Sequence, residues 1–175
     1  MREAEAHEKY NGVIWYLLGT WAVLRFSPKD IGVMSVLLLS WCDTAASTIG
    51  RLWGRYTPRI RQGKSLAGSL AACVVGIATA LLFWGWVAPS CQMRGLADDT
   101  GVNAFAFQSR LSLPGNFKAT TISGGLALGV MSLCAGLIAS ASEAFYVFGW
   151  DDNVTMPVLC GAGLWAFLKI FGSAS

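Results

Sequence analysis

Long uncharged runs of apolar residues restrict this chain to a membrane-embedded helical fold. The clearest run extends from Leu66 to Ala88 and contains no charged side chain, and about 20 apolar residues are enough for an α-helix to cross the hydrocarbon core. Soluble domains average about 25% charged residues, whereas this 175-residue chain has 13% charged and 54% hydrophobic residues. We therefore predict an all-α fold, a polytopic transmembrane helical bundle of about five spans.

The predicted spans form one membrane-embedded domain over residues 1–175. They cover residues 11–26, 31–50, 66–88, 120–145 and 156–171. In the fourth span, Gly125 and Gly129 have the GxxxG spacing of closely packed membrane helices, with Gly136 beyond them. The last span is expected to open near Pro157, because proline is tolerated at a helix start.

Two connections between the spans differ in character. Residues 89–118 mix Gly, Pro, Asp and aromatic residues without a period, which predicts an extramembrane loop. Residues 51–65 form a basic loop, which the positive-inside rule places in the cytoplasm. Its five cations are Arg51, Arg55, Arg59, Arg61 and Lys64. With five spans, the N-terminus and the turn at residues 149–153 lie on the same side, so the unusual polar residues should converge on one membrane face.

Asp43 is the first candidate for chemistry, because a carboxylate inside a span costs a few kcal/mol and is functional by default. On a helix it shares a stripe with Ser47, Gly50 and Gly54, at steps of three and four residues. Such a stripe exposes backbone to which ligand phosphates can bind. It can equally serve to pack a neighbouring helix closely, and the sequence leaves both interpretations open.

Gly63, Lys64 and Ser65 open the third span, where a helix N-terminus favours an anion such as a nucleotide phosphate. A P-loop is excluded, because that pattern needs a glycine five positions before Gly63 and Pro58 is found there. The alternative is that the basic loop only sets topology and contacts anionic lipid.

Three carboxylates, those of Glu143, Asp151 and Asp152, surround one helix end and turn. Such oxygen ligands suit Mg²⁺ or Ca²⁺ carrying nucleotide phosphates. The alternative for the Asp-Asp-Asn turn is a helix cap. His7 stands alone, and the five cysteines lack CxxC spacing, so we expect free thiols and no histidine-based metal site.

Two segments carry a resemblance to a known family. "SWCDTAASTIGRLWGRYTPRIRQGKSLAGSLAA" (residues 40–72) and "SEAFYVFGWDDNVTMPV" (residues 142–158) closely resemble the fungal CTP-dependent diacylglycerol kinases, within the wider group of dolichol and phytol kinases. The resemblance covers nearly the whole chain except residues 91–118. It implies that Asp43 and Gly50 are essential. It also implies a phosphate-binding region at Arg51, Lys64 and Ser65, completed by Glu143, Asp151, Asp152 and Asn153.

The resemblance implies CTP-dependent phosphorylation of diacylglycerol to phosphatidic acid, in membranes of the endoplasmic reticulum and nuclear envelope. Arg51 and Lys64 would neutralise phosphate oxygens, and Asp151 and Asp152 would hold the metal. Asp43 would accept the hydroxyl proton or bind the metal instead. Members usually carry a further N-terminal region with an Arg-Lys pair and additional membrane helices. Nothing before Asn11 matches it, so we expect a truncated chain, inactive alone if that region is required.

Three alternatives remain open. The acceptor could be another lipid alcohol, such as dolichol or phytol. The reaction could be cytidylyl transfer to phosphatidic acid. Finally, the chain could be a non-catalytic packing or transport module of the membrane.

Overall fold

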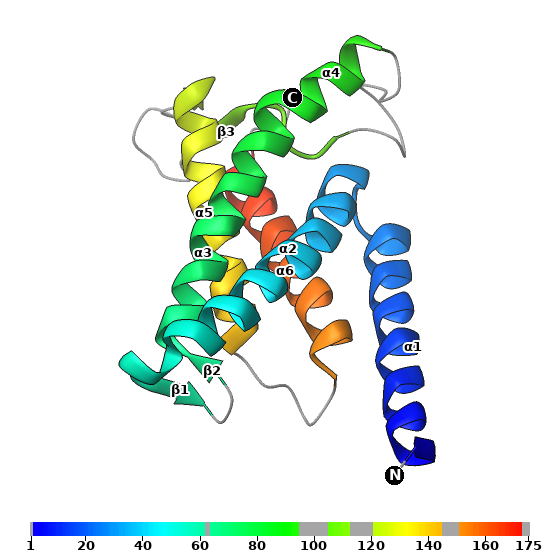
Figure 1. The fold of residues 1–175 in the computed structure, drawn as a ribbon. Coiled ribbons are helices and arrows are strands. Elements are labelled where there is room, and N and C mark those ends of the chain that lie inside the picture. Colours follow the sequence, from blue (N-terminus) through cyan, green and yellow to red (C-terminus); the bar gives the residue numbers. More distant parts are fainter. Residues whose placement is uncertain (1, 62–63, 95–104, 113–120, 145–150, 173–175) are drawn as a thin grey trace.

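The computed structural model describes residues 2–61, 64–94, 105–112, 121–144 and 151–172. Five long helices run alternately in opposite directions through this part of the chain (Figure 1). They are α1 (Arg2–Phe26), α2 (Lys29–Trp53), α3 (Leu66–Leu82), α5 (Gly125–Ala144) and α6 (Asp152–Phe171). The predicted all-α bundle is confirmed.

Within the described residues, four helical stretches are long and apolar enough to cross a membrane: Lys29–Tyr56, Leu66–Cys91, Gly125–Glu143 and Asp152–Phe171. The apolar part of α1, Gly12–Phe26, is shorter and corresponds to the first predicted span. After α3 the chain continues through a π-helical turn, η2 (Phe83–Val87), into the short α4 (Ala88–Met93). The third helical segment therefore extends beyond its predicted end at residue 88.

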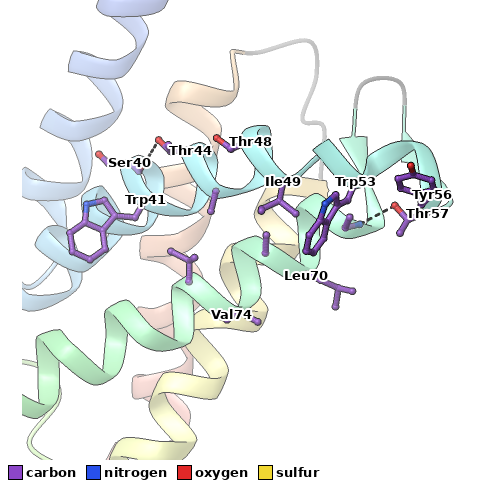
Figure 2. A pocket seen from close by; sticks show the side chains of 14 residues that line it. Ser40, Trp41, Thr44, Thr48, Ile49, Trp53, Tyr56, Thr57, Leu70 and Val74 are labelled. Carbon is purple, nitrogen blue, oxygen red and sulfur yellow. Dashed lines mark hydrogen bonds between the residues drawn. The ribbon is translucent and has the colours of Figure 1, made fainter. Parts of the chain in front are cut away.

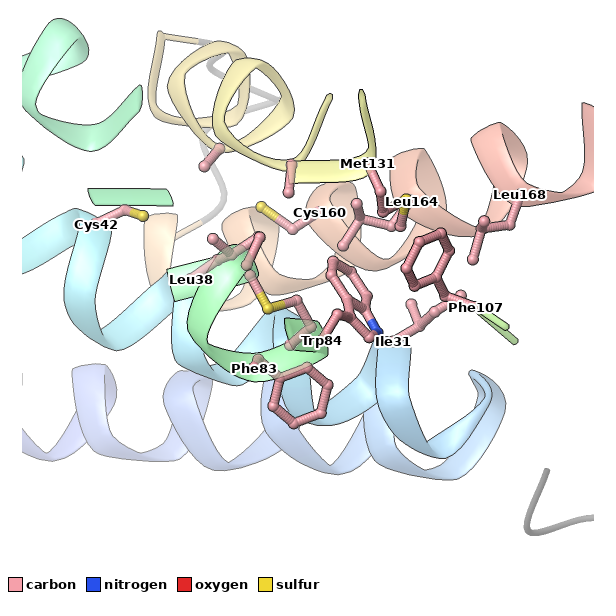
Figure 3. Close-up of a cluster of buried hydrophobic side chains, with 14 of the residues drawn as sticks. Ile31, Leu38, Cys42, Phe83, Trp84, Phe107, Met131, Cys160, Leu164 and Leu168 are labelled. Carbon is pink, nitrogen blue, oxygen red and sulfur yellow. The ribbon is translucent and has the colours of Figure 1, made fainter. Parts of the chain in front are cut away.

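The helices pack around α2. α3 lies between α2 and α5, while α6 contacts α1, α2 and α5. The core contains Ile31 and Leu38 of α2, Met131 of α5 and Leu164 of α6, all fully buried (Figure 3). Because lipid tails are as apolar as these side chains, packing and hydrogen bonds decide which helices associate.

α3 and α5 pack closely at Gly76 and Gly136, where a Cβ on Gly76 would lie 3.0 Å from the Gly136 Cα. A Cβ on Gly136 would lie 2.5 Å from the Cys73 carbonyl oxygen, so only glycine fits there. The expected contact at Gly125 and Gly129 is wrong, since a Cβ on either would meet nothing within 4 Å. Gly125 and Gly129 lie 11 and 7 residues before Gly136 and so share its helical face, but the close contact with α3 forms only at Gly136.

The start of α6 also differs from the expectation. Asp151 caps the helix, because its Oδ1 accepts a hydrogen bond from the Asn153 N–H at 2.9 Å. The helix therefore begins at Asp152, and Pro157 lies inside it rather than at its start. The cap extends α6 toward its N-terminus, so the helix starts before residue 156, where the apolar run and the predicted span begin.

Residues 51–65 are more ordered than a loop. α2 continues to Trp53 and a 3₁₀ turn, η1 (Gly54–Tyr56), follows. The antiparallel strands β1 (Arg59–Arg61) and β2 (Lys64–Ser65) then form a hairpin that leads directly into α3. This β1–β2 hairpin lies at the same end of the bundle as the start of α6 (Figure 1).

At the opposite end of α2, Asp30 was missed by the sequence analysis. Its carboxylate is 0% exposed. It accepts hydrogen bonds from Trp84 Nε1 at 3.3 Å and from the backbone N–H groups of Ala106 and Phe107 at 3.0 Å each. Asp30 therefore fixes part of the 89–118 connection, which also contributes β3 (Arg110–Ser112), paired with β4 (Thr121–Ser123).

Candidate active site

A polar cavity of about 260 Å³ lies between α2, the β1–β2 hairpin, the start of α3 and the end of α5. Most of the predicted site residues line it. Its lining residues are Asp43, Ala46, Ser47, Gly50, Arg51, Lys64, Ser65, Gly68, Ser69 and Glu143. The expected convergence of polar residues from distant parts of the sequence is thus observed.

Lys64 is the centre of this cavity's charge network. Its Nζ forms an ion pair and hydrogen bond with Glu143 Oε1 and a second ion pair with Asp152 Oδ2 at 3.2 Å. The side chains of Lys64 and Glu143 are 20% and 5% exposed, whereas that of Asp152 is 45% exposed. Burial lowers the pKa of Lys64, but the hydrogen bond and charge of Glu143, together with Asp152, outweigh burial and raise the pKa above its ordinary value. Lys64 therefore remains a cation at physiological pH.

Asp43 faces the same cavity from α2. Within the described part of the chain, no ion pair occupies its carboxylate. Arg51 lies one turn beyond Ser47 on the same helix, and its Nε donates to the Ser47 carbonyl oxygen at 3.0 Å. The cavity thus presents two cationic side chains and two carboxylates, of which Glu143 is paired with Lys64 and Asp43 has no ion-pair partner among the described residues.

The glycines of the predicted stripe serve chiefly to pack α2 against α3. A Cβ on Gly54 would lie 2.8 Å from Ser65 Oγ, and one on Gly50 would lie 3.3 Å from the same atom. From the other side, a Cβ on Gly68 would lie 2.8 Å from the Ala46 carbonyl oxygen. These distances favour the packing interpretation for Gly54, while Gly50 both packs and lines the cavity.

The N-terminus of α3 differs from the expectation of free N–H groups. Its first three N–H groups already donate within the protein: Leu66 to the Pro58 carbonyl oxygen (3.1 Å), Ala67 to Thr57 Oγ1 (3.3 Å) and Gly68 to Ser65 Oγ (3.3 Å). An anion in the cavity would therefore be bound by side chains, with the helix dipole adding a favourable field. Gly63 lies outside the described residues.

The predicted metal ligands are only partly brought together. Glu143 and Asp152 share Lys64, whereas Asp151 caps α6. The Asn153 side chain lies near Gly12 of α1. Among the described residues, no group of three or more His, Cys, Asp or Glu side chains is arranged to hold a metal ion. The five cysteines are free thiols, as expected.

An apolar groove of about 1090 Å³ follows the other side of the α2–α3 pair, and sequence reasoning did not find it. Trp41, Trp53, Tyr56, Leu70 and Val74 line it between mid-α2 and the β1–β2 hairpin (Figure 2). The sequence contains these aromatic residues, but it does not show that α2 and α3 diverge and leave a groove between them.

The fold and cavity define an α-helical polytopic membrane protein with a polar site at one end, lined by both cationic side chains and carboxylates. Its sequence is related to the fungal CTP-dependent diacylglycerol kinases, which confirms the resemblance found from the motifs. Proteins named CTP-dependent diacylglycerol kinase 1 share 45% identity over 159 residues in Eremothecium gossypii, 40% over 171 in Saccharomyces cerevisiae and 42% over 168 in Schizosaccharomyces pombe.

These alignments cover 91%, 98% and 96% of this chain, but 44%, 53% and 65% of the respective relatives. The chain thus spans about half the length of the curated relatives it matches. No family model matches the chain. No solved structure matches it either.

Proposed function

We propose that this chain carries the phosphotransferase site of a CTP-dependent diacylglycerol kinase, which converts diacylglycerol to phosphatidic acid at the cytoplasmic membrane face. One observation carries the proposal: Lys64 is held as a cation between Glu143 and Asp152, in a cavity that Asp43 also faces. A triphosphate from the aqueous side and a hydroxyl from the bilayer can meet there. The relatives named for this activity support the choice of donor and acceptor.

In the proposed reaction, the free hydroxyl oxygen of diacylglycerol attacks the γ-phosphorus of CTP. The new phosphorus–oxygen bond forms as the bond to CDP breaks, and the hydroxyl proton passes to Asp43. Because phosphoryl transfer depends on positioning and charge stabilisation, the roles of Lys64 and Arg51 are to neutralise phosphate oxygens. Phosphatidic acid and CDP are the products.

The lipid acceptor would approach along the apolar groove. Asp43 and Ser47 line the polar cavity, whereas the next residues in sequence, Thr44 and Thr48, line the groove. Thr44 Oγ1 donates to the Ser40 carbonyl oxygen at 2.6 Å, so this hydroxyl needs no partner from a lipid. Hydrocarbon chains therefore suit this wall, and the hairpin end of the groove would receive the glycerol end.

A divalent cation, Mg²⁺ or Ca²⁺, is also part of the proposal. The described side chains do not form a complete metal site, so the ion would arrive on the CTP phosphates. The partly exposed Asp152 is the predicted ligand best able to receive it, and the steps above do not pass through the ion. Following the family resemblance, we place the protein in the endoplasmic reticulum and nuclear envelope, with the β1–β2 hairpin in the cytoplasm.

The test is transfer of label to lipid in membranes that contain this protein. With γ-³²P-labelled CTP and added diacylglycerol, we expect labelled phosphatidic acid, and about a hundredfold less with Asp43→Asn. Label from α-³²P-labelled CTP should stay out of lipid, because cytidylyl transfer alone would carry it there. Preferential labelling of dolichol or phytol would show that the acceptor is that alcohol and not diacylglycerol. Absence of labelled lipid in membranes that contain the folded protein would contradict the proposal.

A further inference from the structure

Ser69, on the second turn of α3, has a hydroxyl with no hydrogen-bond partner. The residue is 6% exposed and lines the polar cavity. Among the described residues, the Oγ of Ser69 and the Oγ1 of Thr20 are the two buried side-chain atoms without a partner. A buried polar group left unpaired costs about 1 to 3 kcal/mol, so its presence requires an explanation.

The ordinary remedy for a helical hydroxyl is a bond to the carbonyl four residues earlier. Other hydroxyls in this chain make that bond, at 2.6–2.7 Å: those of Ser35, Thr44, Thr79, Ser90 and Ser132. Ser69 does not make that bond, so its buried hydroxyl has no partner in a residue that lines the cavity. The position of Ser69 is therefore not explained by the stability of α3.

We infer that Ser69 Oγ donates a hydrogen bond to a phosphate oxygen of the nucleotide. The inference rests on the proposed function, since it assigns a further binding residue to the same cavity. Ser65 is the N-cap of α3, and it lines the same cavity as Ser69 and as Lys64, which directly precedes it. The first three N–H groups of α3 are already paired. A side-chain hydroxyl therefore supplies the donor that the helix N-terminus itself cannot.

The chain offers a matched control in Thr20 of α1, the second unpaired hydroxyl, which does not line the polar cavity. Ser69→Ala and Thr20→Val each remove one unpaired buried hydroxyl and little else. Both variants should keep or slightly raise the thermal unfolding temperature in detergent micelles, because neither loses a hydrogen bond within the protein. A clear fall for Ser69→Ala relative to Thr20→Val would reveal a structural partner and overturn the inference.

Equilibrium binding of radiolabelled CTP to the purified protein, with inorganic tripolyphosphate as competitor, gives the decisive comparison. We expect Ser69→Ala to weaken both ligands about tenfold or more, as for a hydrogen bond to a charged group, and Thr20→Val to bind like the unaltered protein. Equal binding by the two variants would overturn the role of Ser69 alone. Weaker CTP binding with unchanged tripolyphosphate competition would move the contact to the nucleoside and also overturn it. Absence of CTP binding by the unaltered protein would instead refute the proposed function and this inference together.

Discussion

Replacement of Lys64 by glutamine tests how strongly the cavity depends on one cation. Among the described residues, Lys64 is the only ion-pair partner of Glu143, whose side chain is 5% exposed. Removing one member of a fully buried pair costs about 3 to 5 kcal/mol, because the other charge is left uncompensated. Since Lys64 is 20% and Asp152 45% exposed, solvent screens part of this, and we expect Lys64→Gln to lower the free energy of unfolding by about 2 to 3 kcal/mol.

Arg59→Gln is the matched control. It removes the same charge from the same hairpin, but Arg59 is exposed, so we expect a change within about 0.5 kcal/mol. The assay is unfolding of the purified protein in detergent micelles, followed by circular dichroism.

A double variant separates charge from packing. Lys64→Gln combined with Glu143→Gln leaves two amides that can bond to each other, and it should recover most of the stability lost in Lys64→Gln. Equal stability of Lys64→Gln and Arg59→Gln, or no recovery in the double variant, would refute the assigned ion-pair network.

Three further predictions concern stability. Asp30→Asn should lower the free energy of unfolding by about 2 to 4 kcal/mol, because an amide cannot accept all three hydrogen bonds made by the buried carboxylate. Chemical unfolding measures this change, and a change near zero would contradict the role assigned to these hydrogen bonds. Gly136→Ala should lower the free energy of unfolding by about 1 to 3 kcal/mol, because the added methyl group clashes with α3. Gly125→Ala should leave it unchanged in the same assay. Similar losses in the two variants would contradict the α3–α5 contact at Gly136. The pKa of Lys64 is raised above its ordinary value of 10.5, so its ion pairs stabilise the fold fully at neutral pH and up to about pH 10.5, and this stabilisation is lost as the pH rises through the higher folded pKa. The free energy of unfolding measured from neutral to alkaline pH should show this loss in the unaltered protein. The Lys64→Gln, Glu143→Gln double variant should not show it.

The approach of Asp43, Lys64 and Glu143 could be predicted because hydropathy sets the direction of each span. Once the basic segment is placed at one end, alternating helices bring the polar ends of α2 and α5 to it. Hydropathy does not set the rotation of a helix about its axis or the path of a hairpin. The pairing of Lys64 with Glu143, 79 residues away, depends on both, so it emerged only from the structure.

The misplaced glycine contact concerns position along a helix and not its rotation. GxxxG spacing shows that a helix has a small-residue face, but it does not show at which point of that face a partner helix comes close. Gly125, Gly129 and Gly136 share one face of α5, and the contact with α3 near Gly76 forms at Gly136. The role of Asp30 could not be predicted, because two of its three hydrogen-bond donors are backbone N–H groups in an aperiodic segment. Sequence patterns do not indicate which side chain such N–H groups bind.

The start of α6 shows how local capping limits boundary prediction. The apolar run begins at Met156, and the predicted boundary followed it. In the structure, the Asp151 cap adds a polar first turn. This turn brings Asp152 to Lys64, so residues that hydropathy assigned to a connection contribute to the site.

The most direct test of the central claim, that Lys64 binds nucleotide phosphate, is the dependence of rate on CTP concentration at saturating diacylglycerol. The measurement compares Lys64→Gln with Arg59→Gln, with rates normalised to folded protein. We predict that Lys64→Gln lowers kcat/KM for CTP by the equivalent of about 2 to 4 kcal/mol, whereas Arg59→Gln stays within about twofold of the unaltered protein. Equal and small effects of the two substitutions would contradict the claim and leave the hairpin cations as a topology signal.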